Sequence, residues 1–202
     1  MKTYRSAVSA LAVLVIALFA GCAVRPTSPH PHQWKRPLND KQLGVRNHGK
    51  VTPYLWRGAQ PRGVAEFKKL ETLGVKTILN LRAFHDDFAE LADTKLKYVR
   101  IPMFAHAPGQ GQGSQLILAL KTIEKLTKDP ASRPVYVHCR GGNDRTGFTV
   151  AAYRILYEGW TADEAIQEMF DYGFHRILFP CNPTYLRELK VSRTRELLNR
   201  AP

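Results

Sequence analysis

The segment PVYVHCRGGNDRTGFTVAAYRILYEG, residues 134–159, decides the fold class of this chain. Its first half is a short apolar run that is typical of a buried strand, and a Gly-Gly pair follows soon after it. Apolar residues then recur at helical spacing until Gly159, which is expected to end the helix. A strand that passes through a tight turn into a helix is a building unit of α/β proteins with a parallel sheet. The apolar stripe of the expected helix consists of Phe148, Ala151, Ala152, Ile155 and Leu156.

The rest of the chain repeats this alternation of strands and helices. Further strands are expected within VTPYLWRGAQP (51–61), at Val75–Arg82 and at Tyr98–Met103. Helices are expected near residues 64–73, in SQLILALKTIEKLTKDP (114–130), after the capping box Thr161–Glu164, and from Asn182-Pro183 onward. We therefore predict an α/β fold with a central, mostly parallel sheet of four to five strands flanked by helices.

Size and composition fit one globular domain that favours anionic partners. The chain has 202 residues, of which 44% are hydrophobic and 10% aromatic, so it can bury a sizeable core. Its formal net charge is +13, which attracts phosphate groups, acidic lipids or nucleic acid. No stretch interleaves aromatic residues with Lys and Arg in the manner of a nucleic-acid platform, and we expect no nucleic-acid partner.

The N-terminus has the layout of a secretory signal peptide. Lys2 and Arg5 precede an apolar run over residues 7–20, which is shorter than the ~20 apolar residues needed to cross a bilayer. The run ends in FAGC, which resembles the bacterial lipoprotein signal, in which the cysteine, here Cys22, becomes the lipidated first residue. Phe19 departs from that signal, where leucine is usual, and the alternative is an ordinary secreted protein that is cut nearby.

This resemblance implies a domain organisation and a location. Residues 1–21 are then a signal peptide, residues 22–50 a flexible tether rich in Pro and His, and residues 51–202 the folded domain. Acyl chains on Cys22 would anchor that domain to a membrane surface. Ala23, in place of an Asp, favours the outer membrane, so we expect a lipid-anchored protein at the periplasmic face of the cell envelope.

Two segments of the chain fit the spacing Cys-x5-Arg, and only one of them has the surroundings of a site. Cys181 and Arg187 flank a segment that contains a proline and no glycine, and no apolar strand precedes it. We interpret that segment as a loop and helix start without a catalytic role. Cys139 and Arg145 instead follow a buried strand and flank the Gly-Gly pair.

The surroundings of Cys139 predict an anion-binding cradle. The strand delivers Cys139 to the carboxyl edge of the sheet, where α/β folds place their ligands. Gly141 and Gly142 allow successive backbone N–H groups to point inward, and a helix that begins near Arg145 directs its positive end at the loop. The same helix end stabilises a thiolate, and the planar fork of Arg145 matches two phosphate oxygens. The structural alternative is an inert buried cysteine in a glycine turn.

The stretch HCRGGNDRTG, residues 138–147, resembles the signature of cysteine-based protein tyrosine phosphatases. The resemblance covers about residues 53–187, and the segments LWRGAQP and AAYRILYEGWTADEAIQEM are similar to bacterial dual-specificity-like phosphatases. It implies a phosphatase domain that hydrolyses phosphotyrosine or phosphoserine/threonine of proteins without a metal or other cofactor. The alternatives are a phosphatase of phosphoinositides or inositol phosphates and a phosphate-binding pseudophosphatase.

The resemblance also implies roles for the residues of the loop. Cys139 is the nucleophile that forms a cysteinyl-phosphate, and Arg145 binds the phosphate and stabilises the transition state. Thr146 helps the thiolate to leave, unless it is a simple helix-start residue. His138 orients the loop, unless it only faces the core. The remaining phosphate-binding positions are Arg140, Gly141, Gly142 and Asn143.

The source of the leaving-group proton departs from the family pattern. In the family an Asp comes from the loop after the strand that corresponds to Tyr98–Met103, but the loop FAHAPGQGQGS has no carboxylate and only His106 titrates. Asp144, directly before Arg145, is our leading candidate for the general acid, and an ion pair that holds the loop is its alternative. Asp86 and Asp87 follow another strand at the same sheet edge and are further candidates.

The oxidising compartment that export implies adds a hypothesis about redox control. With Cys22 lipidated, Cys181 is the only protein thiol that could pair with Cys139. A reversible Cys139–Cys181 disulfide is one possibility, and a buried, inert Cys181 is the alternative that we favour.

Overall fold

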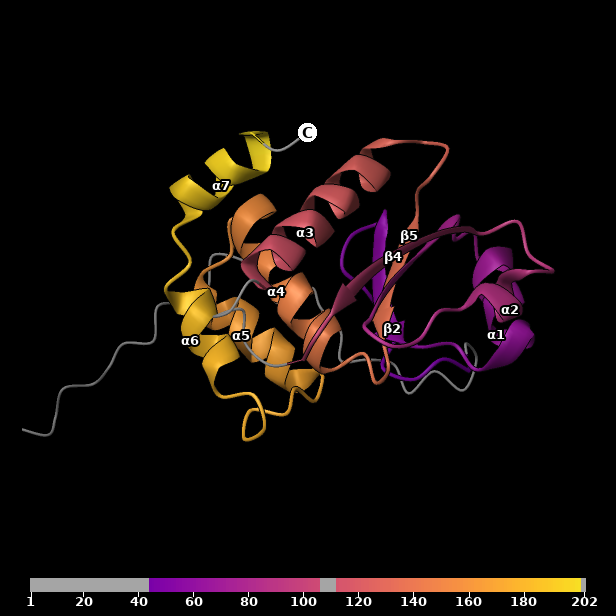
Figure 1. The fold of residues 1–202 in the computed structure, drawn as a ribbon, viewed down its shortest axis with the longest axis horizontal. Helices are drawn as coiled ribbons and strands as arrows, with labels where there is room; N and C mark the ends of the chain where they lie inside the picture. Colours follow the sequence, from indigo (N-terminus) through magenta and orange to yellow (C-terminus); the bar gives the residue numbers. More distant parts are fainter. Residues whose placement is uncertain (1–43, 106–111, 201–202) are drawn as a thin grey trace, which may run out of the picture. The chain divides into compact units, whose positions relative to one another are not determined.

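A computed structural model describes residues 44–105 and 112–200 of the chain (Figure 1). Five strands alternate with helices along the first two thirds of this part, and four helices follow one another at its end. The strands are β1 (Gly49–Lys50), β2 (Leu55–Ala59), β3 (Thr77–Arg82), β4 (Lys97–Met103) and β5 (Val135–Cys139). The helices are α1 (Gly63–Thr72), α2 (Phe88–Leu91), α3 (Gln112–Lys128), α4 (Asp144–Tyr157), α5 (Ala162–Asp171), α6 (Cys181–Arg187) and α7 (Val191–Arg200).

The strands form one mixed sheet in the order β1-β2-β5-β3-β4. The pairs β2–β5, β5–β3 and β3–β4 are parallel, and only the short edge strand β1 is antiparallel to its neighbour. The central strand β5 is fully buried and carries Cys139 as its last residue, beside Ala59 of β2. The predicted α/β fold with a mostly parallel sheet of four to five strands is therefore confirmed, with five strands observed.

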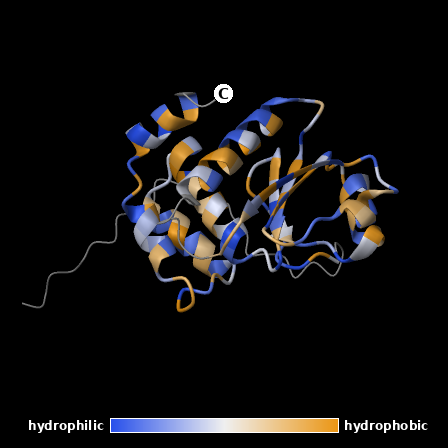
Figure 2. Ribbon diagram, in the orientation of Figure 1, coloured by the Kyte–Doolittle hydropathy of each residue, from blue (hydrophilic) through white to orange (hydrophobic). Residues whose placement is uncertain are grey.

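Helices cover both faces of the sheet. The larger core lies between the sheet and helices α3 to α7, and the smaller one lies between the sheet and helices α1 and α2 (Figure 1). Residues of α3 and α7 alternate between hydrophobic and hydrophilic along each helix (Figure 2), as expected where only one helix face is buried. None of the helices in the described ranges is long and apolar enough to cross a membrane.

The folded domain begins before residue 51, where the expected tether ended. Val45 is buried in the smaller core, and Gly49 and Lys50 pair with Arg57 and Trp56 as strand β1. This two-residue strand is too short to give a periodic signal, so residues 44–50 looked like tether in the sequence. The predicted signal peptide, Cys22 and most of the tether lie outside the described residues.

Helix ends follow the predicted chemistry in one case and depart from it in another. Thr161 and Glu164 form the predicted capping box at the start of α5. Helix α6 instead begins at Cys181, one residue before the predicted cap Asn182, so Pro183 occupies the third helical position. Proline is tolerated there because N–H groups in the first helical turn have no intrahelical acceptor.

Candidate active site

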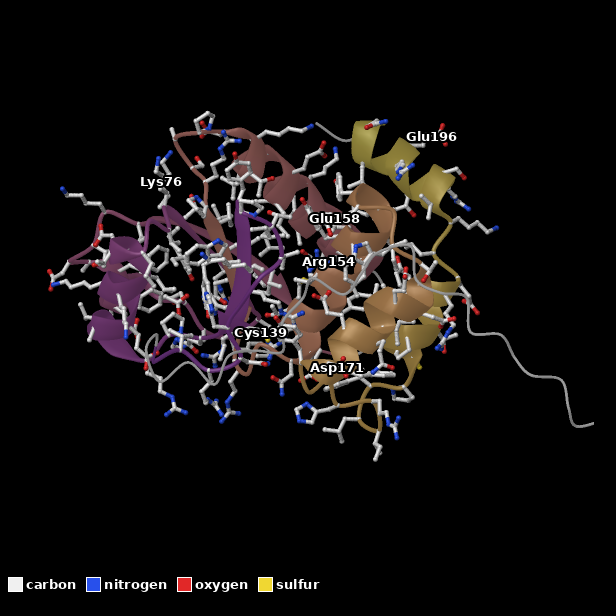
Figure 3. All side chains as sticks on the ribbon, turned by 180° about the vertical axis from the view of Figure 1, so that it is seen from behind. Lys76, Cys139, Arg154, Glu158, Asp171 and Glu196 are labelled. Carbon is white, nitrogen blue, oxygen red and sulfur yellow. The ribbon has the colours of Figure 1, made fainter. Side chains whose placement is uncertain are left out.

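The loop between β5 and α4 crosses the carboxyl edge of the sheet in four residues. Cys139 ends β5 and is only 2% exposed, and α4 begins at Asp144. Figure 3 shows Cys139 at this end of the strand, close to the first turn of α4. The N–H of Gly147 donates to the Asn143 carbonyl at 3.0 Å, which closes the first turn directly after the loop. The cysteine therefore lies beneath the positive end of a 14-residue helix.

Gly142 is the position at which the loop requires glycine. Its φ is +75°, and a Cβ there would lie 2.5 Å from the Gly58 carbonyl carbon and 2.7 Å from the Ala59 nitrogen. The loop therefore packs directly against the backbone of β2, and no residue with a side chain fits at position 142. A Cβ on Gly141 would meet only the Asn143 side chain at ordinary contact distance.

Asn47 holds the outer side of the loop. Its amide nitrogen lies 3.2 Å from the Gly141 carbonyl oxygen, 2.6 Å from Oδ1 of Asn143 and 2.9 Å from the Tyr172 carbonyl oxygen. Asn47 itself has φ +57°, a conformation that asparagine adopts more readily than most residues. Sequence reasoning missed this residue, because it placed residues 22–50 in the tether.

Two predicted site residues have buried polar atoms that make no hydrogen bond within the described part of the chain. They are Nε of Arg145 and the hydroxyl oxygen of Thr146. Both residues belong to the first turn of α4, next to Cys139. Buried polar atoms are almost always satisfied in folded proteins, so these atoms indicate where an anionic ligand would be bound.

His138 and Asp87 form a buried pair beneath the loop. Both side chains are 0% exposed, and His138 Nε2 lies 3.0 Å from Oδ2 of Asp87. Asp87 also accepts hydrogen bonds from Gln60 Nε2 at 2.9 Å and Asn80 Nδ2 at 2.8 Å. On the opposite side of its ring, His138 Nδ1 lies 3.4 Å from the Cys139 carbonyl oxygen. The position of His138 fits loop orientation, whereas Asp87 is a fully bonded support and not an acid that faces the substrate.

Gln60 connects a second arginine to the loop. Its N–H donates to the Arg140 carbonyl at 3.4 Å, and its side-chain oxygen accepts a hydrogen bond from Arg82 Nη1. Burial lowers the pKa of Arg82, and the positive charges of Arg145 and Arg140 lower it further. Arg82, Arg140 and Arg145 form no ion pair with a carboxylate of residues 44–105 and 112–200. The three positive charges therefore lie close enough together for two of them to lower the pKa of the third.

The remaining candidates for the general acid differ in their positions. Both oxygens of Asp144 contact the ring Nδ1 of His175, at 2.9 Å and 3.1 Å, and one accepts the His175 N–H at 3.0 Å. Asp86 is exposed and accepts the N–H of Phe88 at 3.2 Å. His106 lies outside the described residues. Asp144 therefore stays beside the phosphate loop with a histidine partner that sequence reasoning did not foresee.

Arg57 is a further residue of this site that sequence reasoning missed. It belongs to β2, is 1% exposed, and donates from Nη2 to the Gly142 carbonyl at 3.0 Å. The sequence did contain a sign of this role, because Arg57 is a charged residue inside LWRGA, a strand whose five residues are all buried. A charge at such a position needs a structural or functional reason.

The second Cys-x5-Arg segment has none of this geometry. Cys181 is exposed and opens the seven-residue helix α6, and Arg187 donates to Asp163 at 2.9 Å on the surface. The expectation of a buried Cys181 is therefore wrong, because the residue lies in the first helical turn and faces outward. Both cysteines are free thiols, and a reversible disulfide between them stays a possibility that the structure does not test.

Within the described ranges, no group of three or more His, Cys, Asp or Glu side chains is arranged to hold a metal ion. The described residues of the site bring together a thiol, a helix N-terminus, arginines and two Asp–His pairs.

Comparison with curated proteins finds relatives that carry a dual-specificity phosphatase name. The chain is 31% and 30% identical over 125 residues to the dual specificity protein phosphatase TpbA of two strains of Pseudomonas aeruginosa. Each match covers 62% of this chain and 54% of the relative, so the chain spans about half the length of the curated relatives it matches.

Solved structures show the same fold at lower identity. The crystal structure of P. aeruginosa TpbA has a TM-score of 0.65 and 24% identity, and the match covers 79% of this chain and 98% of the crystallised TpbA chain. A TpbA variant in complex with phosphotyrosine gives the same TM-score and identity over 80% and 99%. The catalytic core of the PP-IP phosphatase SIW14 from S. cerevisiae gives 0.61 and 22% over 77% and 92%.

A protein-family model matches most of the folded part of the chain. The model described as PTP-NADK, a DSP-PTPase phosphatase fused to NAD+ kinase, matches residues 36–176. This range is more than half of the chain and contains the complete loop from Cys139 to Arg145. The chain therefore belongs to the DSP-PTPase family, the dual-specificity-like branch of the cysteine-based protein tyrosine phosphatases.

Proposed function

We propose that this protein is a phosphatase that hydrolyses phosphotyrosine or phosphoserine/threonine of proteins through a cysteinyl-phosphate. One observation carries the proposal: Cys139 lies under the N-terminus of α4, beside buried polar atoms of Arg145 and Thr146 that have no partner in the described chain. Such a site binds a dianion and presents a nucleophile to it.

In the first step, the thiolate of Cys139 attacks phosphorus, and the bond between phosphorus and the leaving oxygen breaks. Backbone N–H groups of residues 140–145 and the guanidinium of Arg145 stabilise the charge on the three equatorial oxygens. The leaving oxygen takes a proton as it departs. In the second step, water attacks the cysteinyl-phosphate, the S–P bond breaks, and the hydroxyl of Thr146 donates to the sulfur that leaves as thiolate.

Asp144 supplies the proton in this proposal. It directly precedes Arg145, so it lies at the edge of the site that would hold the phosphate. His175 fixes both carboxylate oxygens in place. A histidine that exchanges a proton with this carboxylate would let the pair serve as acid in the first step and as base in the second.

A protein substrate is favoured by the relatives. The curated relatives are named dual specificity protein phosphatases, and the variant TpbA structure contains phosphotyrosine. An aryl phosphate ester projects its phosphorus away from the ring, which suits a thiol that is only 2% exposed.

A second candidate substrate is an inositol phosphate or phosphoinositide with several phosphates. The observation that favours it is the cluster of Arg82, Arg140 and Arg145, whose mutual repulsion a polyanion would relieve. The similar fold of the PP-IP phosphatase SIW14 agrees with this class. Phosphoanhydride substrates would also need less help from a general acid, but an exported protein rarely meets them.

A phosphate-release screen tests the function and separates these candidates. The panel is p-nitrophenyl phosphate, phosphotyrosine and phosphoserine/threonine peptides, phosphoinositides and inositol polyphosphates, with Cys139→Ser as the blank. The proposal expects turnover by the wild type alone, with phosphopeptides as the best class. If wild type and Cys139→Ser release phosphate at the same rate, the mechanism is wrong, and if neither does, the protein is a pseudophosphatase.

We also propose that the protein is exported and anchored to the periplasmic face of the cell envelope through a lipid on Cys22. The support is the layout of residues 1–22, which lie outside the described ranges. Mass spectrometry of the membrane fraction tests it: the N-terminal peptide should begin at Cys22 and carry acyl groups. A protein that begins elsewhere and remains in the soluble fraction contradicts it.

A further inference from the structure

Arg57 is a buried cation that forms no ion pair with a carboxylate of the described residues. Its side chain is 1% exposed, and its Nε and Nη1 make no hydrogen bond within the described residues. Burial lowers the pKa of Arg57, while the charges of Glu168, Tyr172 and Cys139 oppose this effect. Burying a charge at such a place is unfavourable unless a countercharge lies nearby.

The carboxylate that could serve is already engaged. Glu168 is buried and accepts two hydrogen bonds from Arg154, at 3.0 Å from Nε and 2.9 Å from Nη2. Arg154 lies farther along α4 from Cys139 (Figure 3). Arg154 also donates from Nη1 to Glu158, so its charge is shared by two carboxylates. Glu168 therefore still acts on Arg57 through its charge, although the described residues show no ion pair between the two.

Three contacts hold the Arg57 guanidinium against the loop between β5 and α4 and the first turn of α4. It donates to the Gly142 carbonyl at 3.0 Å, and it lies over the ring of Tyr172 at 3.7 Å from the ring centre. A Cβ on Gly147 would lie 3.5 Å from Nη2, so the first turn of α4 packs on the same group. Each contact restricts the guanidinium, and none neutralises it.

We propose that Arg57 is a positioning residue whose charge, held under the loop by Gly142 and Tyr172, keeps the sulfur of Cys139 ionised. Cys139 ends the strand next to that of Arg57, and a negative charge on its sulfur would interact favourably with the Arg57 guanidinium. Arg82 also interacts electrostatically with Cys139 and Arg145, and in the proposed reaction a bound phosphate takes up the charge of Arg145. Arg57 lies behind the loop, so its charge acts on the thiol before any substrate binds.

This inference rests on the proposed function, because an ionised nucleophile matters only to a reactive cysteine. Its test needs no turnover. Iodoacetamide alkylates the thiolate, so its rate at Cys139, followed by mass spectrometry of the peptide across the pH range, reports ionisation directly. A wild type without phosphatase activity would sink the proposed function and leave this measurement intact.

The variants Arg57→Met and Arg57→Gln remove the charge, and Arg57→Lys retains it. We expect the two neutral variants to move the midpoint of the Cys139 alkylation profile up by about one pH unit. At the wild-type midpoint, their alkylation would then be about fivefold slower. Gln keeps a donor for Gly142, so it still tests the charge if Arg57→Met does not fold. Arg57→Lys should stay within about 0.3 unit of the wild type, because its ammonium supplies the same charge.

Two controls separate this electrostatic effect from damage to the fold. Cys181 in the same molecules should keep its own profile in every variant. Tyr136→Phe removes the hydrogen bond from the Tyr136 hydroxyl to the Ala59 carbonyl, 2.7 Å long, from the end of β2 without changing a charge. It should lower the melting temperature and leave the Cys139 midpoint unchanged. A wild-type midpoint in the neutral variants, or an equal rise in Arg57→Lys, overturns the proposal.

Discussion

The two Cys-x5-Arg segments of this chain have the same spacing and opposite surroundings. Cys139 ends a fully buried strand beneath the N-terminus of a 14-residue helix, whereas Cys181 is exposed and begins a seven-residue helix. Arg145 has no carboxylate partner within the described residues, whereas Arg187 pairs with Asp163 on the surface. The difference shows that a strand before the cysteine and a helix after it create the site, and that the spacing alone does not.

The largest contrast is expected at the two cysteines. Cys139→Ser should lower kcat by at least about 10⁴-fold, because it replaces the thiolate nucleophile with a neutral hydroxyl. Cys181→Ser changes an exposed side chain at the start of α6 and should stay within about twofold of the wild type. Steady-state kinetics with p-nitrophenyl phosphate measure both. A large loss in Cys181→Ser would show that the second segment takes part in function.

The two arginines give the next contrast. Arg145→Lys retains a charge but loses the planar fork, so kcat should fall by about 10²- to 10³-fold. Arg187→Lys keeps the charge and at most weakens an exposed ion pair with Asp163, so it should have the wild-type kcat. The same assay measures both, with melting temperatures as a check on folding. Equal losses would mean that the spacing, and not the surroundings, defines the site.

Local pattern was enough to predict the loop and the sheet that presents it. The apolar run before Cys139, the glycine pair and the helical stripe after Arg145 are all near one another in sequence. Each feature has a direct physical meaning, so the strand, the turn and the helix N-terminus could be predicted together. The Thr161 capping box was predictable for the same reason.

The supports of the loop could not be predicted, because they come from distant parts of the chain. Asn47 is 96 residues from Asn143, and Arg57 is 85 residues from Gly142. Asp87 looked like a possible acid from its place after a strand, but its carboxylate turns inward to His138, which is 51 residues away. Such contacts depend on which strands become neighbours, and one sequence does not determine that order.

Substitution of Asp144 tests whether the Cys139 loop carries its own general acid. The segment from Cys181 to Arg187 contains no carboxylate that could take this role. Asp144→Asn should lower kcat about 10²-fold for alkyl phosphates and less for p-nitrophenyl phosphate, whose leaving group needs little protonation. His175→Gln should lower kcat by a smaller factor, because Asp144 remains beside the site. Aryl phosphates of graded leaving-group pKa give the slope. An unchanged rate and slope in Asp144→Asn would transfer the role to Asp86 or His106.

The smallest contrast concerns the third residue after each cysteine. Gly142→Ala forces a left-handed conformation on a residue whose Cβ would lie 2.5 Å from the Gly58 backbone, so unfolding should require about 3 kcal/mol less free energy. Thr184→Ala replaces an exposed residue inside α6 with a better helix former and should change stability by less than about 0.5 kcal/mol. Urea denaturation measures both variants, and activity per folded molecule should fall only in Gly142→Ala. Equal stability would mean that the loop can move away from β2, and the close packing of Gly142 on Gly58 would then not position Cys139.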